Sequence, residues 1–180
     1  MRAGGWQVPT RRGSTLEVHR EAGPPRLTIV VHAGQRVCEL EIATDRDSGV
    51  IRHVDRWQLS VAHPPASGEW WLLDADGAAR CTVTRTTPFA ERFHIQIEGR
   101  DFHVVPMGRW WRRRWWVCDA EERTVLEVRQ RLLARPIHDL AIRSGDLPAD
   151  LCWVVAWLLA ERTTRELAAT RRPRYWVPGV

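Results

Sequence analysis

The residues with the clearest chemistry lie in one run, Arg109 to Trp116, with the sequence RWWRRRWW. Guanidinium groups pair with phosphate, in some cases through two parallel hydrogen bonds, and indole rings favour the interface between lipid and water. The composition of this run therefore suits an anionic membrane surface. The residues expected to contact lipid head groups and the adjoining bilayer are Arg109, Trp110, Trp111, Arg112, Arg113 and Arg114.

Two other interpretations of this run stay open. In the first, the tryptophans close one end of the fold and the arginines stack on their rings as surface cation–π pairs. In the second, the tryptophans stack on nucleic-acid bases and the arginines contact the phosphates. No nucleic-acid-binding motif accompanies the run, so nucleic acid ranks below lipid as a partner. Trp115 and Trp116 are expected to be packed, because they belong to a repeat.

Catalytic and metal-binding residues are not indicated. His94 and His103 are expected on adjacent strands, but the sequence contains neither GxSxG nor HExxH. The cysteines lie too far apart for a zinc site and are expected to be reduced core residues; they are Cys38, Cys81, Cys118 and Cys152. We therefore expect no catalytic residue, no metal and no cofactor, and a protein that is not an enzyme.

The net charge of +5 comes entirely from an excess of arginine, since the chain has no lysine. It has no asparagine either, which is the bias of GC-rich coding sequence, so the charge is weak evidence for nucleic-acid binding. The N-terminal stretch has no apolar segment like that of a signal peptide. The longest apolar run, Leu151 to Ala160, is about half of the roughly 20 residues that a membrane-spanning helix needs. A cytoplasmic location is expected, with peripheral attachment to the inner membrane face as the membrane alternative.

A repeat indicates how the chain is organised. WWLLDADG, from Trp70, and WWVCDAEE, from Trp115, align at an offset of 45 residues, and the match continues into the following strands. A weaker third copy precedes them, in which Gly34 corresponds to Gly77 and Cys38 to Cys81. The acidic residues at Asp74 and Asp119 fall at the same point of the repeat, which favours turn chemistry over paired catalytic carboxylates.

Alternating apolar residues and turn signals recur about every ten residues up to residue 143. They predict strands over residues 16–19, 26–32, 37–43, 50–54, 57–62, 70–74, 80–85, 93–98, 102–105, 114–118, 125–129 and 137–142. Period two directs one set of side chains inward: Cys81, Val83, Phe93, Ile95, Ile97, Leu126, Val128, Leu140 and Ile142. Their neighbours, Glu127 among them, are expected to point outward.

The chain closes with a helix that is apolar on every side. It is expected to begin after Asp146, as the capping residue, with Pro148 in its first turn. Because LCWVVAWLLA, from Leu151, offers no polar face, this helix must be enclosed on all sides. A closed barrel around the helix provides that enclosure and leaves no exposed sheet edge.

The repeated units, the strand pair RFHIQIEGRDFHVV and the closing helix LPADLCWVVAWLLAERTTRE together resemble the tubby C-terminal-like superfamily, in its LURP-one-related and phospholipid-scramblase-like branch. The resemblance covers roughly residues 26 to 169 and implies twelve strands around a hydrophobic C-terminal helix. It also implies a domain of the kind that binds phosphoinositide head groups or is linked to lipid scrambling. It does not extend to the Pro-rich and Cys-rich lead segments of scramblases, and Asp146 and Asp150 are too few carboxylates for calcium.

The sequence thus predicts a mainly β protein: a closed antiparallel barrel of about twelve strands that encloses a hydrophobic C-terminal helix. Residues 1–14 are expected to form a flexible arm, residues 15–170 a single barrel domain with its central helix at about 147–169, and residues 171–180 a basic, aromatic tail. The expected function is that of a monomeric, non-enzymatic binding or scaffold domain that contacts anionic phospholipid. The alternative is a protein-interaction module that meets a protein partner and has no lipid role.

Overall fold

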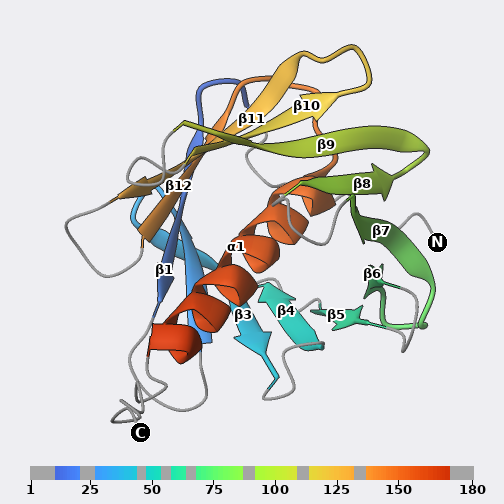
Figure 1. Ribbon diagram of the computed structural model, residues 1–180, viewed down its shortest axis with the longest axis vertical. Helices are drawn as coiled ribbons and strands as arrows, with labels where there is room; N and C mark the ends of the chain where they lie inside the picture. The colour runs from blue at the N-terminus through green and yellow to red at the C-terminus, as the bar shows by residue number, and fades with distance from the viewer. Residues whose placement is uncertain are drawn as a thin grey trace, which may run out of the picture.

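The computed structural model describes residues 11–20, 27–43, 48–53, 58–63, 68–86, 92–108, 114–131 and 137–170. In this part of the chain, twelve strands are followed by one helix (Figure 1). The strands are β1 Thr15–Arg20, β2 Leu27–His32, β3 Gln35–Ile42, β4 Gly49–His53, β5 Gln58–Ala62, β6 Glu69–Leu73, β7 Ala79–Arg85, β8 Phe93–Ile97, β9 Arg100–Met107, β10 Arg114–Asp119, β11 Thr124–Arg131 and β12 Ile137–Ile142. The helix, α1, spans Ala149–Thr170.

The strands form a closed antiparallel barrel. Each strand pairs with the next along the chain, and β12 returns to pair with β1, with Leu140 opposite Leu16. Closure leaves no strand edge free to pair with another chain. The predicted fold class is therefore confirmed, and each predicted strand corresponds to an observed one with ends that differ by a few residues. Most of the expected arm, residues 1–10, and the whole expected tail, residues 171–180, lie outside the described residues.

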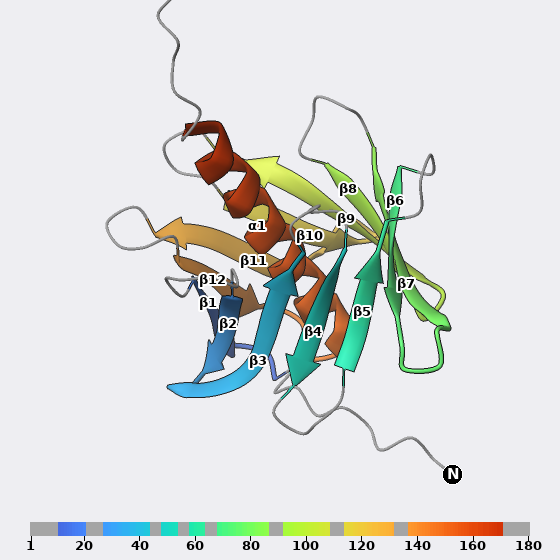
Figure 2. The ribbon, with the colours of Figure 1, turned by 90° about the horizontal axis from the view of Figure 1, so that it is seen from below.

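Helix α1 runs through the ring of strands, as the two perpendicular views show (Figure 2). Every residue from Leu151 to Ala160 is buried, which confirms the expectation that a helix without a polar face is enclosed. Asp146 does not cap the helix as expected. The helix begins at Ala149, too far along the chain for that role, and Asp146 instead pairs with Arg100.

The interior follows the predicted alternation of side chains. All nine residues expected to point inward are buried except Phe93, which is half-buried at one end of the barrel. Glu127 was expected to point outward, which agrees with its place between the inward-facing Leu126 and Val128, yet its side chain is buried. Its carboxylate is covered by two guanidinium groups, those of Arg129, whose Nε donates at 2.8 Å, and Arg143. These hydrogen bonds hold the pKa of Glu127 at about 2, although burial acts in the opposite direction.

The repeat seen in the sequence is a repeat in structure. Trp70 and Trp115 are 7% and 3% exposed and point into the barrel, whereas Trp71 and Trp116 are 36% and 38% exposed on its outer face. Trp116 was expected to be packed and is not, because alternation along β10 turns it away from the core. In each copy the register shifts by one residue just before the turn, between Leu72 and Leu73 and between Val117 and Cys118.

The turns of the repeat also share one residue whose backbone is left-handed, with a positive φ. Gly34 and Gly77 have φ values of 79° and 80°, and Glu122, the corresponding residue of the last copy, has a φ of 61°. Glycine adopts this left-handed conformation without a steric penalty, whereas glutamate does not. The match of three turns supports the third, weaker copy of the repeat.

Replacing Glu122 with glycine is therefore expected to stabilise the protein. The free energy of unfolding should rise by about 0.5–1 kcal/mol, because the relief of strain exceeds the added entropy of the unfolded chain. Urea unfolding followed by circular dichroism measures this change. Ala120, in the same turn but without a positive φ, is the matched control, and Ala120→Gly should lower the stability. A loss of stability in Glu122→Gly would contradict the strain argument.

Candidate functional site

The two ends of the barrel differ in their connections. One end, which we call the short-turn end, carries tight turns such as Ala33–Gly34 and Glu98–Gly99 and the start of helix α1. At the opposite end, the long-loop end, the strands are joined by longer segments, including residues 86–92 and 108–113. Helix α1 points its C-terminal half toward the long-loop end. Loops at one end of a rigid barrel are the usual place for a binding site.

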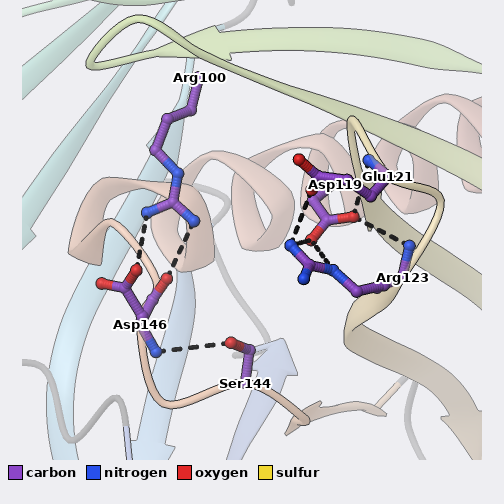
Figure 3. A network of polar contacts seen from close by, with 6 residues as sticks. All are labelled: Arg100, Asp119, Glu121, Arg123, Ser144 and Asp146. Carbon is purple, nitrogen blue, oxygen red and sulfur yellow. Dashed lines mark hydrogen bonds and ion pairs between the residues drawn. The ribbon is translucent and has the colours of Figure 1, made fainter.

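The acidic turns of the short-turn end are structural. The Oδ1 atom of Asp119 accepts hydrogen bonds from the backbone amides of Glu121 and Arg123, at 3.1 and 2.9 Å, and Arg123 Nε donates to Oδ2 at 2.8 Å (Figure 3). Burial tends to raise the pKa of Asp119, but the hydrogen bonds and charge of Arg123 outweigh it and lower the pKa. Asp74 accepts equivalent bonds from Asp76 and Ala78. Both carboxylates are thus used within their own turns.

The start of the helix is tied to the same end of the barrel by two arginines. Arg100 donates from Nη2 to the carbonyl oxygen of Asp146 at 3.1 Å, with its Nη1 3.6 Å from the carboxylate (Figure 3). Arg80 Nε donates at 2.8 Å to the Oδ2 atom of Asp150, in the first turn of the helix. Burial raises the pKa of Asp150, and the charge of Arg80 only partly offsets this effect. These contacts fix the position of the helix within the barrel.

A cavity of about 180 Å³ opens at the long-loop end, between the second half of helix α1 and strands β6 to β11. Its walls are mainly apolar and aromatic and include Trp70, Phe93, Val104, Trp115, Val155 and Leu158. Three charged residues complete the lining: Arg85, Glu161 and Arg162. The guanidinium group of Arg162 lies over the ring of Trp115, 4.8 Å from its centroid, so this cation is held at the edge of the cavity.

Two hydrogen-bond donors of the cavity lining have no hydrogen-bond partner among the residues that the structure describes, and the same lining contains the buried carboxylate of Glu161. They are the indole Nε1 of Trp70 and the Nε of Arg85, and both atoms are buried. Buried donors are nearly always satisfied in folded proteins, since an unsatisfied one costs about 1–3 kcal/mol. The cavity therefore offers two hydrogen-bond donors within an apolar surround, which is the arrangement of a small-molecule site.

Only one residue of the predicted lipid site falls in the described part of the chain. Arg114 is the first residue of β10, exposed, and opposite Met107 and Arg129 in the barrel. Arg109, Trp110, Trp111, Arg112 and Arg113 lie outside the described residues. The segment that holds them joins Gly108 to Arg114, both at the long-loop end, next to Trp115 of the cavity wall.

Arg85, Glu161 and Arg162 were not among the residues that the sequence pointed to. A signal for Arg85 was present, because it continues the period-two series of Cys81 and Val83, both of which point inward. Glu161 and Arg162 directly follow the apolar run of the helix. Charged residues at the end of an inward-facing series are therefore the pattern to examine in a barrel of this kind.

The histidines and cysteines show no catalytic arrangement in the described part of the chain. His94 Nε2 lies 2.9 Å from Asp101 Oδ1, and the His94 ring stacks on His103 with centroids 5.1 Å apart, on the outer face. Burial raises the pKa of the thiols of Cys38, Cys81 and Cys152 to about 12, which keeps them in the unreactive protonated form. No cluster of three or more metal-ligating side chains occurs within the described ranges.

Charge is distributed unevenly between the two ends. Among the described residues, every carboxylate that is largely exposed lies at the short-turn end: Asp76, Glu98, Glu121, Glu122 and Asp146. The long-loop end presents exposed arginines, namely Arg92, Arg114 and Arg131, the last of them paired with Asp139, in addition to Arg85 and Arg162 at the cavity. The short-turn end also has exposed arginines, namely Arg11, Arg12, Arg36, Arg123 and Arg143, so the exposed charges there nearly cancel. Within the described residues, no helix is both long and apolar enough to span a bilayer.

Comparisons with known proteins bear on the fold alone. No family model and no curated protein matches the chain. A search of solved structures found the X-ray structure of the Arabidopsis thaliana protein AT5G01750, with a TM-score of 0.56 and 10% sequence identity. The match covers 87% of this chain and 95% of that chain. At this level of identity, the similarity shows a shared fold alone.

Proposed function

We propose that this chain is a non-catalytic binding domain that rests its long-loop end on an anionic phospholipid surface. The observation that carries the proposal is the uneven charge of the barrel. The long-loop end presents Arg92, Arg114 and Arg131 without a largely exposed carboxylate among the described residues, while at the opposite end exposed carboxylates offset the exposed arginines. In the field of an anionic surface, this distribution orients the barrel with its long-loop end toward the lipid.

The sequence of the connection between β9 and β10 supports the same orientation. This connection adds Arg109, Arg112 and Arg113, together with Trp110 and Trp111, between two strand ends that lie at the long-loop end. Arginine near an anionic bilayer contributes about 1 kcal/mol per residue, and tryptophan adds interfacial anchoring. The proposal therefore assigns head-group contacts to the arginines and insertion at the interface to the two tryptophans.

Co-sedimentation with liposomes tests the proposal. The protein should bind vesicles that contain acidic phospholipid, at low salt, and bind weakly to neutral vesicles. The triple variant Arg112→Gln, Arg113→Gln, Arg114→Gln removes about 3 kcal/mol of attraction and should weaken binding about a hundredfold. Binding should also weaken at high salt, since charges on an exposed surface are screened within about 10 Å at 0.1 M salt.

The matched control removes three arginines from the other end. Arg11, Arg12 and Arg36 are exposed near the short-turn end, and their replacement by glutamine changes the net charge by the same amount. This control variant should retain most of its binding. Equal losses in the two variants would reduce the effect to net charge and contradict the proposed orientation. Absence of binding to acidic vesicles would overturn the lipid role and leave a protein-interaction module as the hypothesis to pursue.

A further inference from the structure

The cavity at the long-loop end is large enough to hold a small apolar group. Its volume is about 180 Å³, and an apolar cavity of about 150 Å³ is known to hold one benzene molecule. Its aromatic walls are rigid, because Trp70 packs edge to face on Phe93, with ring centroids 6.3 Å apart, and against Trp157 at 6.5 Å. A chain of six to eight carbon atoms is therefore the apolar group that suits this space.

The polar atoms of the lining define what the apolar group should carry. The Nε of Arg85 and the Nε1 of Trp70 are both donors, both are buried, and neither has a hydrogen-bond acceptor among the described residues. A ligand that supplies an acceptor oxygen removes the cost of leaving them unsatisfied. Because one donor belongs to a guanidinium group, a carboxylate is the acceptor that gains most.

The charges around the cavity agree with an anionic ligand. Two guanidinium groups, those of Arg85 and Arg162, line it, whereas Glu161 is the only carboxylate among the described residues of the lining. Arg162 is fixed over the Trp115 ring at 4.8 Å, so its charge stays beside the opening. The net charge of these three side chains is positive. A protonated amine would therefore lie near two charges of its own sign and one of the opposite sign.

We infer that this cavity binds a short acyl chain with its carboxylate on Arg85 and its hydrocarbon against the tryptophan and valine walls. The inference goes beyond the proposed membrane contact. It concerns a free amphiphile in the cavity and does not depend on arginines of the connection between β9 and β10. Trp70 Nε1 is the second donor to the carboxylate.

Calorimetric titration of the full chain, in solution without vesicles, tests this inference. The probes are octanoate, octanol and octylamine, which share one chain and differ in the head group. Octanoate should bind at least about tenfold more tightly than either of the others, since a hydrogen bond to a charged group is worth about that factor. Preference for octylamine, equal binding of octanol and octanoate, or no binding of octanoate would each overturn the inference.

Two variants test whether the ligand binds in the cavity with its carboxylate on Arg85. Arg85→Gln should weaken octanoate about tenfold and leave octanol unchanged, whereas Val128→Phe should fill the cavity and remove the binding of both. If Val128→Phe does not fold, Arg85→Gln alone decides, and unchanged octanoate binding in that variant would overturn the inference. Arg36→Gln, an exposed arginine away from the cavity, is the control and should bind octanoate like the unaltered chain.

The proposed membrane contact and the proposed acyl-chain site can be tested independently of each other. The variant with Arg112, Arg113 and Arg114 replaced by glutamine should retain octanoate binding, since the proposed carboxylate site uses Arg85 and Trp70, and Arg114, the one of the three that the structure describes, is not part of the lining. Loss of vesicle binding with retained octanoate binding supports both proposals. Loss of octanoate binding in that variant would contradict the assignment of the carboxylate to Arg85.

Discussion

Replacing Trp157 with alanine is expected to lower the free energy of unfolding by about 3–5 kcal/mol. Trp157 is only 2% exposed and lies on the enclosed helix, where its ring packs against Trp70. The barrel forms a closed wall around it, so neighbouring strands have little freedom to collapse into the space that alanine would leave. A loss of this size is a large part of the 5–15 kcal/mol that stabilises a typical domain.

The neighbouring strand leaves room for the indole ring of Trp157 because it has a glycine, Gly49, at the point of contact. A Cβ atom on Gly49 would lie 2.8 Å from Trp157 Nε1 and 2.6 Å from the carbonyl oxygen of Glu41, closer than real Cβ contacts. The absence of a side chain at Gly49 therefore lets strand β4 approach the helix. This close fit is the reason for expecting a value near the upper part of the range.

Denaturant unfolding followed by far-ultraviolet circular dichroism measures the effect of Trp157→Ala. The matched control is Trp116→Ala, which removes the same side chain from the outer face, where it is 38% exposed. The control should cost less than about 1 kcal/mol. Should Trp157→Ala not fold, Trp157→Phe provides a milder loss of about half the size. Similar costs at the two positions would contradict the enclosure of the helix.

Replacing Arg80 with methionine is expected to destabilise the protein by about 3 kcal/mol at neutral pH. Asp150 is 3% exposed, and its Oδ2 atom accepts a hydrogen bond from Arg80 Nε at 2.8 Å, 70 positions away in the sequence. Without Arg80, the carboxylate must either stay charged in an apolar surround or take up a proton. Some water reaches Arg80, and for that reason the expected loss is at the lower end for a buried ion pair.

The dependence on pH identifies the carboxylate as the cause. Burial raises the pKa of Asp150 above its ordinary value of 3.8, and the loss of Arg80 raises it further. An acid with a raised pKa in the folded state stabilises that state below pH 3.8 and loses the contribution as pH rises through the folded pKa. The difference between Arg80→Met and the unaltered chain should therefore be small near pH 4 and large near pH 7.

Urea unfolding at both pH values measures this difference, and a second variant isolates its origin. Arg80→Met combined with Asp150→Asn removes the buried charge and should recover at least half of the lost stability at pH 7. It should also remove most of the pH dependence. An equal loss at both pH values in Arg80→Met would mean that the methylene packing of Arg80, and not the charge of Asp150, is what matters.

The candidate site was predictable only in part. The sequence drew attention to RWWRRRWW, and of its proposed lipid contacts Arg114 lies within the described residues, exposed at the long-loop end. It did not draw attention to Arg85, because one arginine at the end of a strand is common. Arg85 became a candidate only when the structure placed its Nε inside an apolar cavity with Trp70.

What the sequence determined by itself is the barrel and its central helix. Period-two alternation assigns each strand a face, as for Ile95 and Ile97, and local turn chemistry at Asp74 and Asp119 ends the strands. A helix that is apolar on every side requires enclosure, whatever the order of the strands. These features depend on residues close together in the chain, so a linear pattern is enough to find them.

Only the tertiary structure decided which distant residues meet. The contact of Arg80 with Asp150, the cover of Arg143 over Glu127, and the position of Arg162 over Trp115 each join different elements of the barrel. So does the cavity, whose lining comes from strands β6 to β11 and from helix α1. The reason is physical: closure of the barrel and the rotation of the helix within it set these distances, and neither quantity is encoded in local periodicity.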